Sequence, residues 1–168
     1  MADYAALIGI DWSDRKHDIC LIDPVTGRRE ASILRHSPKT IDEWAAGLRS
    51  RFGGRQLAVC LEQSRGPLIY ALMKYDFITL YPVNPSTLSR YREAFSPSRH
   101  KDDPPDAAYL AELLFSHRDR LRRWQPDSEQ TRTLRYLVEH RRRLVADRTR
   151  ISNRMTSLLK CYFPQVLE

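Results

Sequence analysis

Apolar and polar positions along the N-terminal half of the chain predict five β-strands. The first three runs lie close together, and the turn sequence PVTG separates the second from the third, which predicts an antiparallel meander. The other two runs are almost continuously apolar, as in strands that are buried on both faces. The predicted strands are 5–11, 17–23, 28–35, 56–62 and 77–83.

Helical periodicity fills the segments between these strands. Residues 40–52 carry apolar side chains three and four positions apart, and a capping-box pattern from Thr40 to Glu43 predicts the helix start. Gly53 and Gly54 predict its end. Further helices are predicted at 66–74, at 84–94 and from the PPDA sequence to about His117. The order βββαβαβαα predicts an α/β domain whose helices cover both faces of a mixed sheet. This is compatible with a ribonuclease-H-like fold, although the strand order does not follow from the sequence.

A different pattern begins after the polar link at 118–128. Residues 129–161 predict one long helix, ended by the Phe-Pro pair that follows. Apolar residues recur every seven positions and form a heptad seam, at Leu137, Leu144, Ile151 and Leu158. Arg141 and Arg148 occupy companion positions of the seam, which argues against a plain dimeric coiled coil. A helix this long needs a partner, so we expect a homo-oligomer. The predicted domains are 1–117 and 118–168.

Positive charge is concentrated in this second part. The net charge is +7, and residues 118–160 hold thirteen Lys or Arg against five Asp or Glu. Such a basic segment predicts a nucleic-acid partner, although a solvated helix face would have a similar composition. The candidate nucleic-acid-binding residues are Lys101, Arg122, Arg123, Arg141, Arg142, Arg143, Arg148, Arg150 and Arg154.

Several classes of protein are disfavoured by what the sequence lacks. It has no apolar stretch of membrane-spanning length and no signal-peptide pattern, so we expect a cytoplasmic protein without a membrane partner. Its three scattered cysteines suggest reduced thiols. No Walker A, G-x-G-x-x-G or zinc-ligand spacing is present, which disfavours the commonest phosphate loops and zinc sites.

Acidic residues form the candidate chemistry. Two predicted strands end in an acid, Asp11 after LIGI and Glu62 after AVCL. If these strands are parallel neighbours, both carboxylates emerge at the sheet edge where open α/β sheets bind ligands. Asp103 and Asp106 are three positions apart beside a helix start, so they share one face. Four acids brought together need cations between them, and oxygen ligands suit Mg²⁺, with Mn²⁺ as a substitute. Two such ions, about 3.5–4 Å apart, can promote phosphodiester displacement.

These acids also have purely structural explanations. Pro104 and Pro105 suit the first helical positions. Asp103 would then be the N-cap, and Asp106 the N3 residue beside the positive end of the helix dipole. The two acids at strand ends are likewise explained by contact with solvent.

Three motifs carry a family resemblance: GIDWS at 9–13, LEQS at 61–64 and KDDPPDA at 101–107. With them the chain resembles the DEDD transposases, insertion-sequence recombinases related to Piv-type DNA invertases, which have a RuvC-like N-terminal domain. The third motif usually reads Lys-Thr-Asp-x-x-Asp-Ala in that family, so Asp102 stands in place of the Thr and is a second candidate for the third ligand. The resemblance implies that the catalytic, metal-binding residues are Asp11, Glu62, Asp103 and Asp106.

The resemblance also implies partners. Family members act on DNA, are guided by a structured bridge RNA, and carry a nucleophilic serine in a C-terminal domain that this sequence does not show. We therefore expect the N-terminal part of a bacterial or archaeal recombinase, with little recombination by this part alone. Two rival hypotheses remain, a stand-alone nuclease of the Holliday-junction type and a non-catalytic nucleic-acid-binding module. A sugar-kinase-like ATPase also begins with a strand ending in Gly-x-Asp, but its later phosphate loops are missing.

Overall fold

The computed structural model describes residues 4–62, 66–95, 105–126 and 128–167, and it divides into two compact units. One unit extends to Gln125 and contains the sheet, and the other begins at Pro126 and contains the long helix. The segment after the last helix of the first unit includes the 3₁₀ turn η1 (Arg118–Arg120). It stays attached to the sheet, since the Trp124 N–H donates to the Leu80 carbonyl at 2.8 Å.

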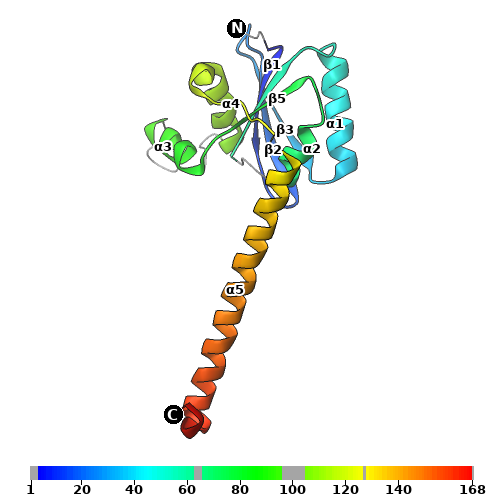
Figure 1. The fold of residues 1–168 in the computed structure, drawn as a ribbon. Coiled ribbons are helices and arrows are strands. Elements are labelled where there is room, and N and C mark those ends of the chain that lie inside the picture. The colour runs from blue at the N-terminus through cyan, green and yellow to red at the C-terminus, as the bar shows by residue number, and fades with distance from the viewer. Residues whose placement is uncertain (1–3, 63–65, 96–104, 127, 168) are drawn as a thin grey trace. The chain divides into compact units, whose positions relative to one another are not determined.

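Five strands form one mixed sheet in the order β3-β2-β1-β4-β5. All five predicted strands and the antiparallel meander of the first three are confirmed. β1 also pairs with β4, and β4 with β5, in parallel. This strand order, with helices on both faces, is that of a ribonuclease-H-like α/β fold (Figure 1). The strands are β1 (Ala6–Asp11), β2 (Lys16–Ile22), β3 (Arg29–Arg35), β4 (Leu57–Leu61) and β5 (Ile78–Pro82).

Helices cover the two faces of the sheet in pairs. α1 (Pro38–Arg51) and α2 (Pro67–Leu72) lie on one face, and α3 (Pro85–Phe95) and α4 (Asp106–His117) lie on the other (Figure 1). Alternate strand residues therefore enter two separate cores, because successive side chains point to opposite faces. The central strands β1 and β4 are buried on both faces, which explains their nearly continuous apolar runs.

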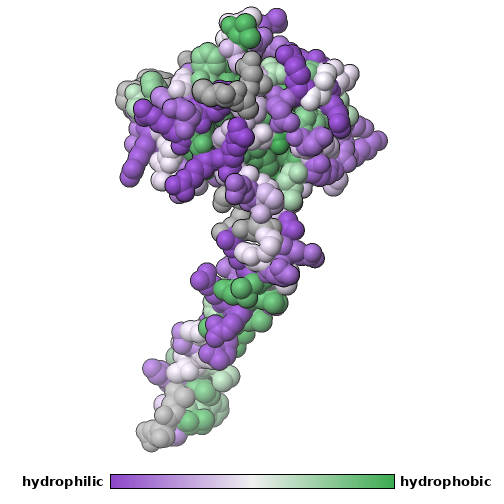
Figure 2. All heavy atoms as spheres, turned by 45° about the horizontal axis from the view of Figure 1, so that its top comes forward, coloured by the Kyte–Doolittle hydropathy of each residue, from purple (hydrophilic) through white to green (hydrophobic). Residues whose placement is uncertain are grey.

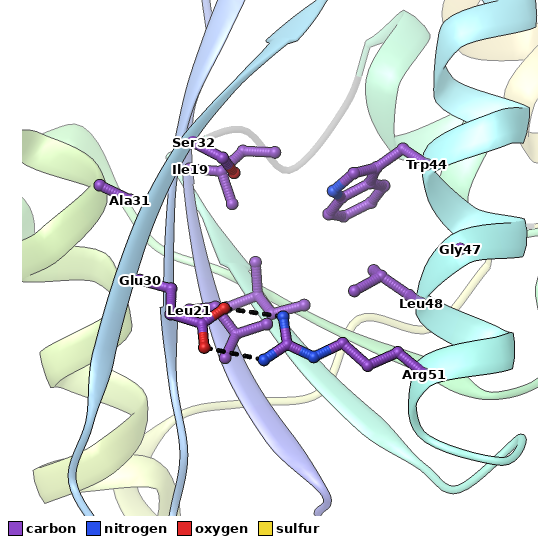
Figure 3. Close-up of a pocket in the computed structure, with 10 residues that line it drawn as sticks. Ile19, Leu21, Glu30, Ala31, Ser32, Trp44, Gly47, Leu48 and Arg51 are labelled. Carbon is purple, nitrogen blue, oxygen red and sulfur yellow. Dashed lines mark hydrogen bonds and ion pairs between the residues drawn. The ribbon is translucent and has the colours of Figure 1, made fainter.

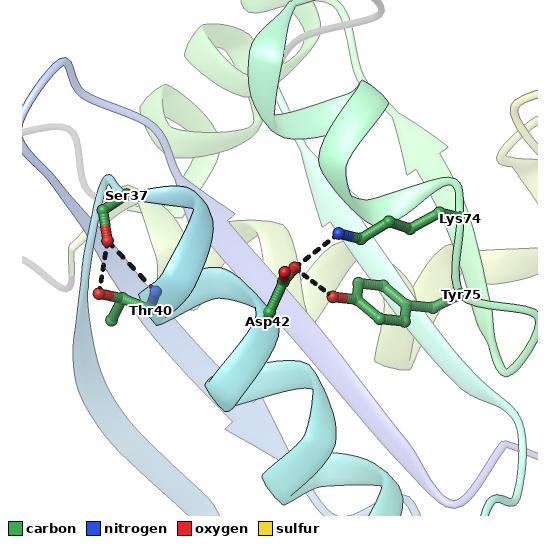
Figure 4. Close-up of polar contacts among 5 residues, drawn as sticks. All are labelled: Ser37, Thr40, Asp42, Lys74 and Tyr75. Atoms are coloured by element: carbon green, nitrogen blue, oxygen red, sulfur yellow. Dashed lines mark hydrogen bonds and ion pairs between the residues drawn. The ribbon is translucent and has the colours of Figure 1, made fainter.

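The start of α1 differs from the sequence prediction. Ser37, not Thr40, is the N-cap, and its hydroxyl accepts a hydrogen bond from the Thr40 N–H at 3.2 Å (Figure 4). The capping-box pattern predicted the helix start three residues too late. The earlier Ser-Pro pair already supplies a cap and a proline for the first turn. Asp42 instead joins α1 to the segment after α2, where it accepts hydrogen bonds from Lys74 and Tyr75, both at 2.6 Å.

The start of α4 also differs. Pro105 has φ −62° and ψ 151° and is the N-cap, so Asp106 is the first helical residue and not the N3 residue. The predicted cap, Asp103, and the preceding Pro104 lie outside the described residues. Extended backbone at Pro105 postpones the helix, and the carboxylate of Asp106 stays beside the positive end of the helix dipole.

A glycine brings α4 unusually close to β1. A Cβ atom on Gly9 would lie 2.0 Å from the Ala107 carbonyl oxygen and 2.4 Å from the Ala111 nitrogen, both of them backbone atoms of α4. Only a residue without a side chain allows this approach. Gly9 therefore fixes the distance between the strand that ends in Asp11 and the helix that begins with Asp106.

The second unit is the long helix α5 (Glu129–Tyr162), followed by the 3₁₀ turn η2 (Pro164–Leu167). The predicted helix is confirmed, with Ser128 as its N-cap. None of its residues is buried, and hydrophobic residues are visible along it in Figure 2. The seam residues Leu137, Leu144, Ile151 and Leu158 are each more than half exposed, at 56%, 56%, 63% and 53%.

Two further expectations concern cysteines and membranes. Cys20 and Cys60 are free thiols buried in the sheet, and burial raises the pKa of both. Within the described ranges, no helix combines the length and the apolar character that a membrane crossing requires.

Candidate active site

Asp11 and Glu62 leave neighbouring strands at the same edge of the sheet. β1 and β4 are parallel, and their register pairs Ile10 with Leu61, so the next residue of each strand is an acid. Both side chains are half-buried. The sequence prediction of two carboxylates at one sheet edge therefore agrees with the topology.

A helix brings Asp106 toward this edge. α4 packs across β1 and β2, and Gly9 keeps the helix close to β1. Pro105, just before Asp106, lines a surface depression. Asp18 of β2 and Ser32 of β3 line the same depression. The start of α4 thus lies near the strand positions that flank Asp11, since Asp18 is the cross-strand partner of Asp11.

Electrostatic coupling links these carboxylates. The pKa of Asp11 is raised above its usual value, first by burial and then by the negative charges of Asp106, Asp18 and Glu62. Arg92 acts in the opposite direction on the same carboxyl. Burial and the surrounding acids therefore disfavour the charged form of Asp11. A bound cation would offset this unfavourable electrostatic energy.

Arg92 on α3 forms an ion pair with Asp106. Its Nη1 donates to Oδ1 at 2.9 Å and to Oδ2 at 3.1 Å. The preceding residue, Tyr91, anchors α3 against α4, because its ring packs on Tyr109 at 6.3 Å and on His117 at 5.9 Å between centroids. This aromatic contact fixes the helix that carries Arg92 relative to the helix that carries Asp106.

The candidate acidic residues fit a metal ion by their chemistry. Carboxylate oxygens are the ligands that Mg²⁺ prefers, and the negative charges of Glu62 and Asp106 both act on Asp11. Among the described residues, however, no three acidic, histidine or cysteine side chains are grouped closely enough to hold a metal ion. Asp103 and Lys101, two further candidates, lie outside the described residues.

Two residues of this region were missed from the sequence. Asp18 faces Asp11 across the antiparallel pair of β1 and β2. The predicted meander could have indicated this contact, because a hairpin places the start of one strand opposite the end of the other. Arg92 carried no such signal. Its contact with Asp106 depends on how α3 and α4 pack, which no local pattern shows.

Comparison with known proteins identifies the family. The matching family model is of the IS110 DEDD type and is described as transposase. It covers residues 8–164. This chain belongs to the IS110 family of DEDD transposases. Membership agrees with the ribonuclease-H-like sheet described above.

Two curated relatives are similar over nearly the whole chain. "Putative transposase y4uE" of Sinorhizobium fredii is 29% identical over 163 residues, which are 95% of this chain and 45% of that protein. "Mini-circle putative transposase for IS117" of Streptomyces coelicolor is 29% identical over 167 residues, which are 95% of this chain and 39% of that protein. The chain thus spans less than half the length of the curated relatives it matches.

In this transposase domain, a histidine pair supports the connection that follows Asp11. His17 is fully buried, and its Nδ1 accepts a hydrogen bond from the Ser13 N–H at 3.3 Å. Its Nε2 therefore carries the proton of the neutral ring and donates to Nδ1 of His36, 2.9 Å away. The Trp12 ring stacks near His17 with centroids 6.4 Å apart, so these rings fix the backbone directly after the strand-end acid.

This pair predicts a pH-dependent stability. Burial, and next the neighbouring His36, lower the pKa of His17 below its usual 6.5, while Asp18 opposes them. The unfolded chain thus takes up a proton that the folded protein rejects, so stability should fall as the pH falls below about 6.5. We expect the drop in Tm between about pH 7.5 and about pH 5.5 to become smaller in His17→Gln. Thermal melts at both pH values measure this drop in Tm.

His140→Gln is the control for this prediction. It removes an exposed histidine of α5 and should leave the drop in Tm unchanged. An equal drop in the wild type and in His17→Gln would contradict the prediction.

The predicted nucleic-acid-binding arginines of the transposase are exposed. Arg122 and Arg123 belong to the first unit, where Arg123 Nε donates to the Tyr81 hydroxyl at 3.2 Å. Arg142 and Arg143 approach Glu139 at 3.8 and 3.6 Å. Arg150 pairs with Asp147 at 2.7 Å. Pairs this exposed are weak, so their arginines are available to other anions. Arg141, Arg148 and Arg154 are also exposed on α5.

A cavity on the other face of the sheet has a different character. It measures about 340 Å³, and apolar residues of α1 and of the sheet line most of it, among them Trp44, Leu48 and Ile19 (Figure 3). Glu30 and Arg51 lie at one end and form a two-pronged ion pair at 2.7 and 2.8 Å. Apolar residues line most of this cavity, whereas two acids leave parallel strands at the sheet edge, and we therefore assign the candidate site to the sheet edge.

Proposed function

We propose that Asp11, Glu62, Asp103 and Asp106 bind Mg²⁺, or Mn²⁺ as a substitute, and organise phosphodiester transesterification on DNA. The observation that carries this proposal is the pairing of β1 and β4 in parallel, which releases Asp11 and Glu62 at one edge of the sheet. The raised pKa of Asp11, caused by burial and by Asp106, Asp18 and Glu62, supports it. A divalent ion would supply Lewis-acid stabilisation of the attacking and leaving oxygens.

The residues of this chain would position that chemistry. β1 and β4 are central strands, so the carboxylates at their ends lie on a rigid support. α4 would bring Asp106 to the same edge over the close contact at Gly9. Asp18 adds a further negative charge beside Asp11 and would strengthen the attraction for a cation.

We further propose that the second unit holds nucleic acid and a second copy of the chain. Its exposed arginines suit phosphate groups of DNA and of a structured guide RNA, and its exposed leucine seam suits another helix. In this proposal the first unit supplies the metal site and the second unit supplies the contacts to nucleic acid and to the second copy.

A calorimetric titration with MnCl₂ tests the metal site. We expect the wild type to bind Mn²⁺, and Asp11→Asn and Asp106→Asn each to bind at least about tenfold more weakly, because each removes a charged oxygen ligand. Asp119→Asn is the matched control, since Asp119 is an exposed acid of η1 and should not change the affinity. Equal affinities in all four proteins would contradict the proposed site.

Two rival functions predict other results. A stand-alone nuclease would cleave branched DNA by itself when metal is added, and Asp11→Asn would abolish the cleavage. A non-catalytic binding module would hold nucleic acid with the same affinity whether or not divalent metal is present, and Asp11→Asn would not change it. Cleavage and binding assays on branched and linear DNA therefore separate the three hypotheses.

A further inference from the structure

Asp106 is held in a contact that competes with metal coordination. The same nitrogen of Arg92 contacts both carboxylate oxygens of Asp106, at 2.9 and 3.1 Å. These are the oxygens that Asp106 would offer to a divalent ion. Since a carboxylate shares its lone pairs among the cations around it, a guanidinium in this position reduces what remains for a metal ion.

The charges around the site point to the same competition. Asp106, Asp18 and Glu62 all act on Asp11 as negative charges, and Arg92 acts on it as a positive one. The positive charge of the Arg92 guanidinium thus partly compensates the negative charges of these acids. Arg92 contacts Asp106 in a structure in which no three of the described acids are grouped closely enough for a metal ion.

We propose that Arg92 exchanges partners during the reaction: a divalent ion displaces it from Asp106, and the released guanidinium then binds a phosphate of the nucleic acid. The inference rests on the proposed metal site. It adds a residue that contacts substrate and that neither the tetrad nor the basic helix includes.

Arginine has the properties that such an exchange needs. A guanidinium keeps its charge at every relevant pH, and its planar donors suit a carboxylate and a phosphate equally well. Arg92 lies in the last turn of α3, and its side chain is 39% exposed while that of Asp106 is 27% exposed. A long, partly exposed side chain can change its rotamer while the helix stays in place. The Tyr91 ring anchors this helix against α4.

The alternative is an ion pair that merely fastens α3 to α4. Such a partly exposed pair contributes little to stability, and it would orient Asp106 for its other contacts. The two explanations differ in the sign of one result. If Arg92 competes with metal, its removal strengthens metal binding; if it orients Asp106, its removal weakens metal binding or leaves it unchanged.

Calorimetry with MnCl₂ on the full chain decides between them. We expect Arg92→Gln to bind Mn²⁺ at least about threefold more tightly than the wild type, because the competing cation is lost. Arg90→Gln is the matched control, since Arg90 is an exposed residue of the same helix and the change in net charge is identical. Its affinity should equal that of the wild type.

Each other outcome has a definite meaning. Affinity in Arg92→Gln that is equal to or below that of the wild type overturns the exchange while leaving the metal site intact. An equal gain in Arg90→Gln shows a general charge effect and also overturns it. Absence of Mn²⁺ binding in all three proteins contradicts the proposed site itself, and the exchange with it.

A second measurement tests the phosphate contact. Binding of a fluorescein-labelled DNA duplex is measured with Ca²⁺, which binds carboxylates, and with EDTA. We expect Arg92→Gln to lose at least about threefold in DNA affinity with Ca²⁺ and to match the wild type with EDTA, where the guanidinium remains on Asp106. The same loss under both conditions, or none under either, would refute a metal-dependent transfer of Arg92 to phosphate.

Discussion

Gly9→Ala should lower the Tm of the first unit by more than about 10 °C, the largest stability change that we expect from any single methyl group in this protein. A Cβ atom at this position would lie 2.0 and 2.4 Å from backbone atoms of Ala107 and Ala111. Backbone cannot rotate away as a flexible side chain can. The strand and the helix must therefore separate, and the core that includes Leu7 and Leu110 opens with them.

Thermal unfolding of Gly9→Ala and Gly47→Ala makes the comparison specific. Gly47 lies inside α1, and a Cβ added there meets nothing within 4 Å. Because alanine is the better helix former, Gly47→Ala should gain about 0.5–1 kcal/mol. A Tm for Gly9→Ala within about 2 °C of the wild type would show that α4 does not approach β1 this closely.

A triple change in α5 should have the largest effect on nucleic-acid binding. We expect Arg141→Gln, Arg142→Gln and Arg143→Gln together to weaken binding to duplex DNA at least about tenfold at low salt and to reduce the salt-dependence slope by about 2–3. Each phosphate contact that is lost removes the release of about one counterion. Fluorescence anisotropy over a range of salt concentrations measures both quantities, and circular dichroism checks that the helix is retained.

The matched control changes the same number of charges elsewhere. Arg28, Arg55 and Arg90 are exposed residues of the first unit, and their joint replacement with Gln lowers the net charge equally. This variant should keep the slope and most of the affinity. If both triple variants lose the same amount, then DNA responds to the total charge of the protein and not to α5.

The strands were predictable because burial on both faces leaves a strong local pattern. Residues of β1 and β4 that enter either core are apolar, and each run stops at an acid, so the sequence indicated both the strands and the candidate ligands at their ends. The meander of β1, β2 and β3 followed from short connections. The parallel pairing of β1 with β4 was a hypothesis, because it joins segments that are far apart in the chain.

Helix starts and long-range ion pairs were less predictable. Ser37 caps α1 although Thr40 offered the more familiar pattern, and Pro105 precedes α4 in extended conformation although a proline suits a first helical turn. In both cases two chemically acceptable starts lie within three residues, so the local pattern alone does not decide between them. The contact of Arg92 with Asp106 arises wholly from the packing of two helices.

The exposure of α5 has a thermodynamic consequence. A 34-residue helix with no buried residue gains no free energy from a core of its own. Local pairs such as Arg150 with Asp147 add only about 0.2–0.5 kcal/mol each. Helix formation and binding of the proposed partner would then be linked equilibria, and the law of mass action would govern both. If the proposed second copy covers the leucine seam, dilution should fray this helix and binding of the copy should order it.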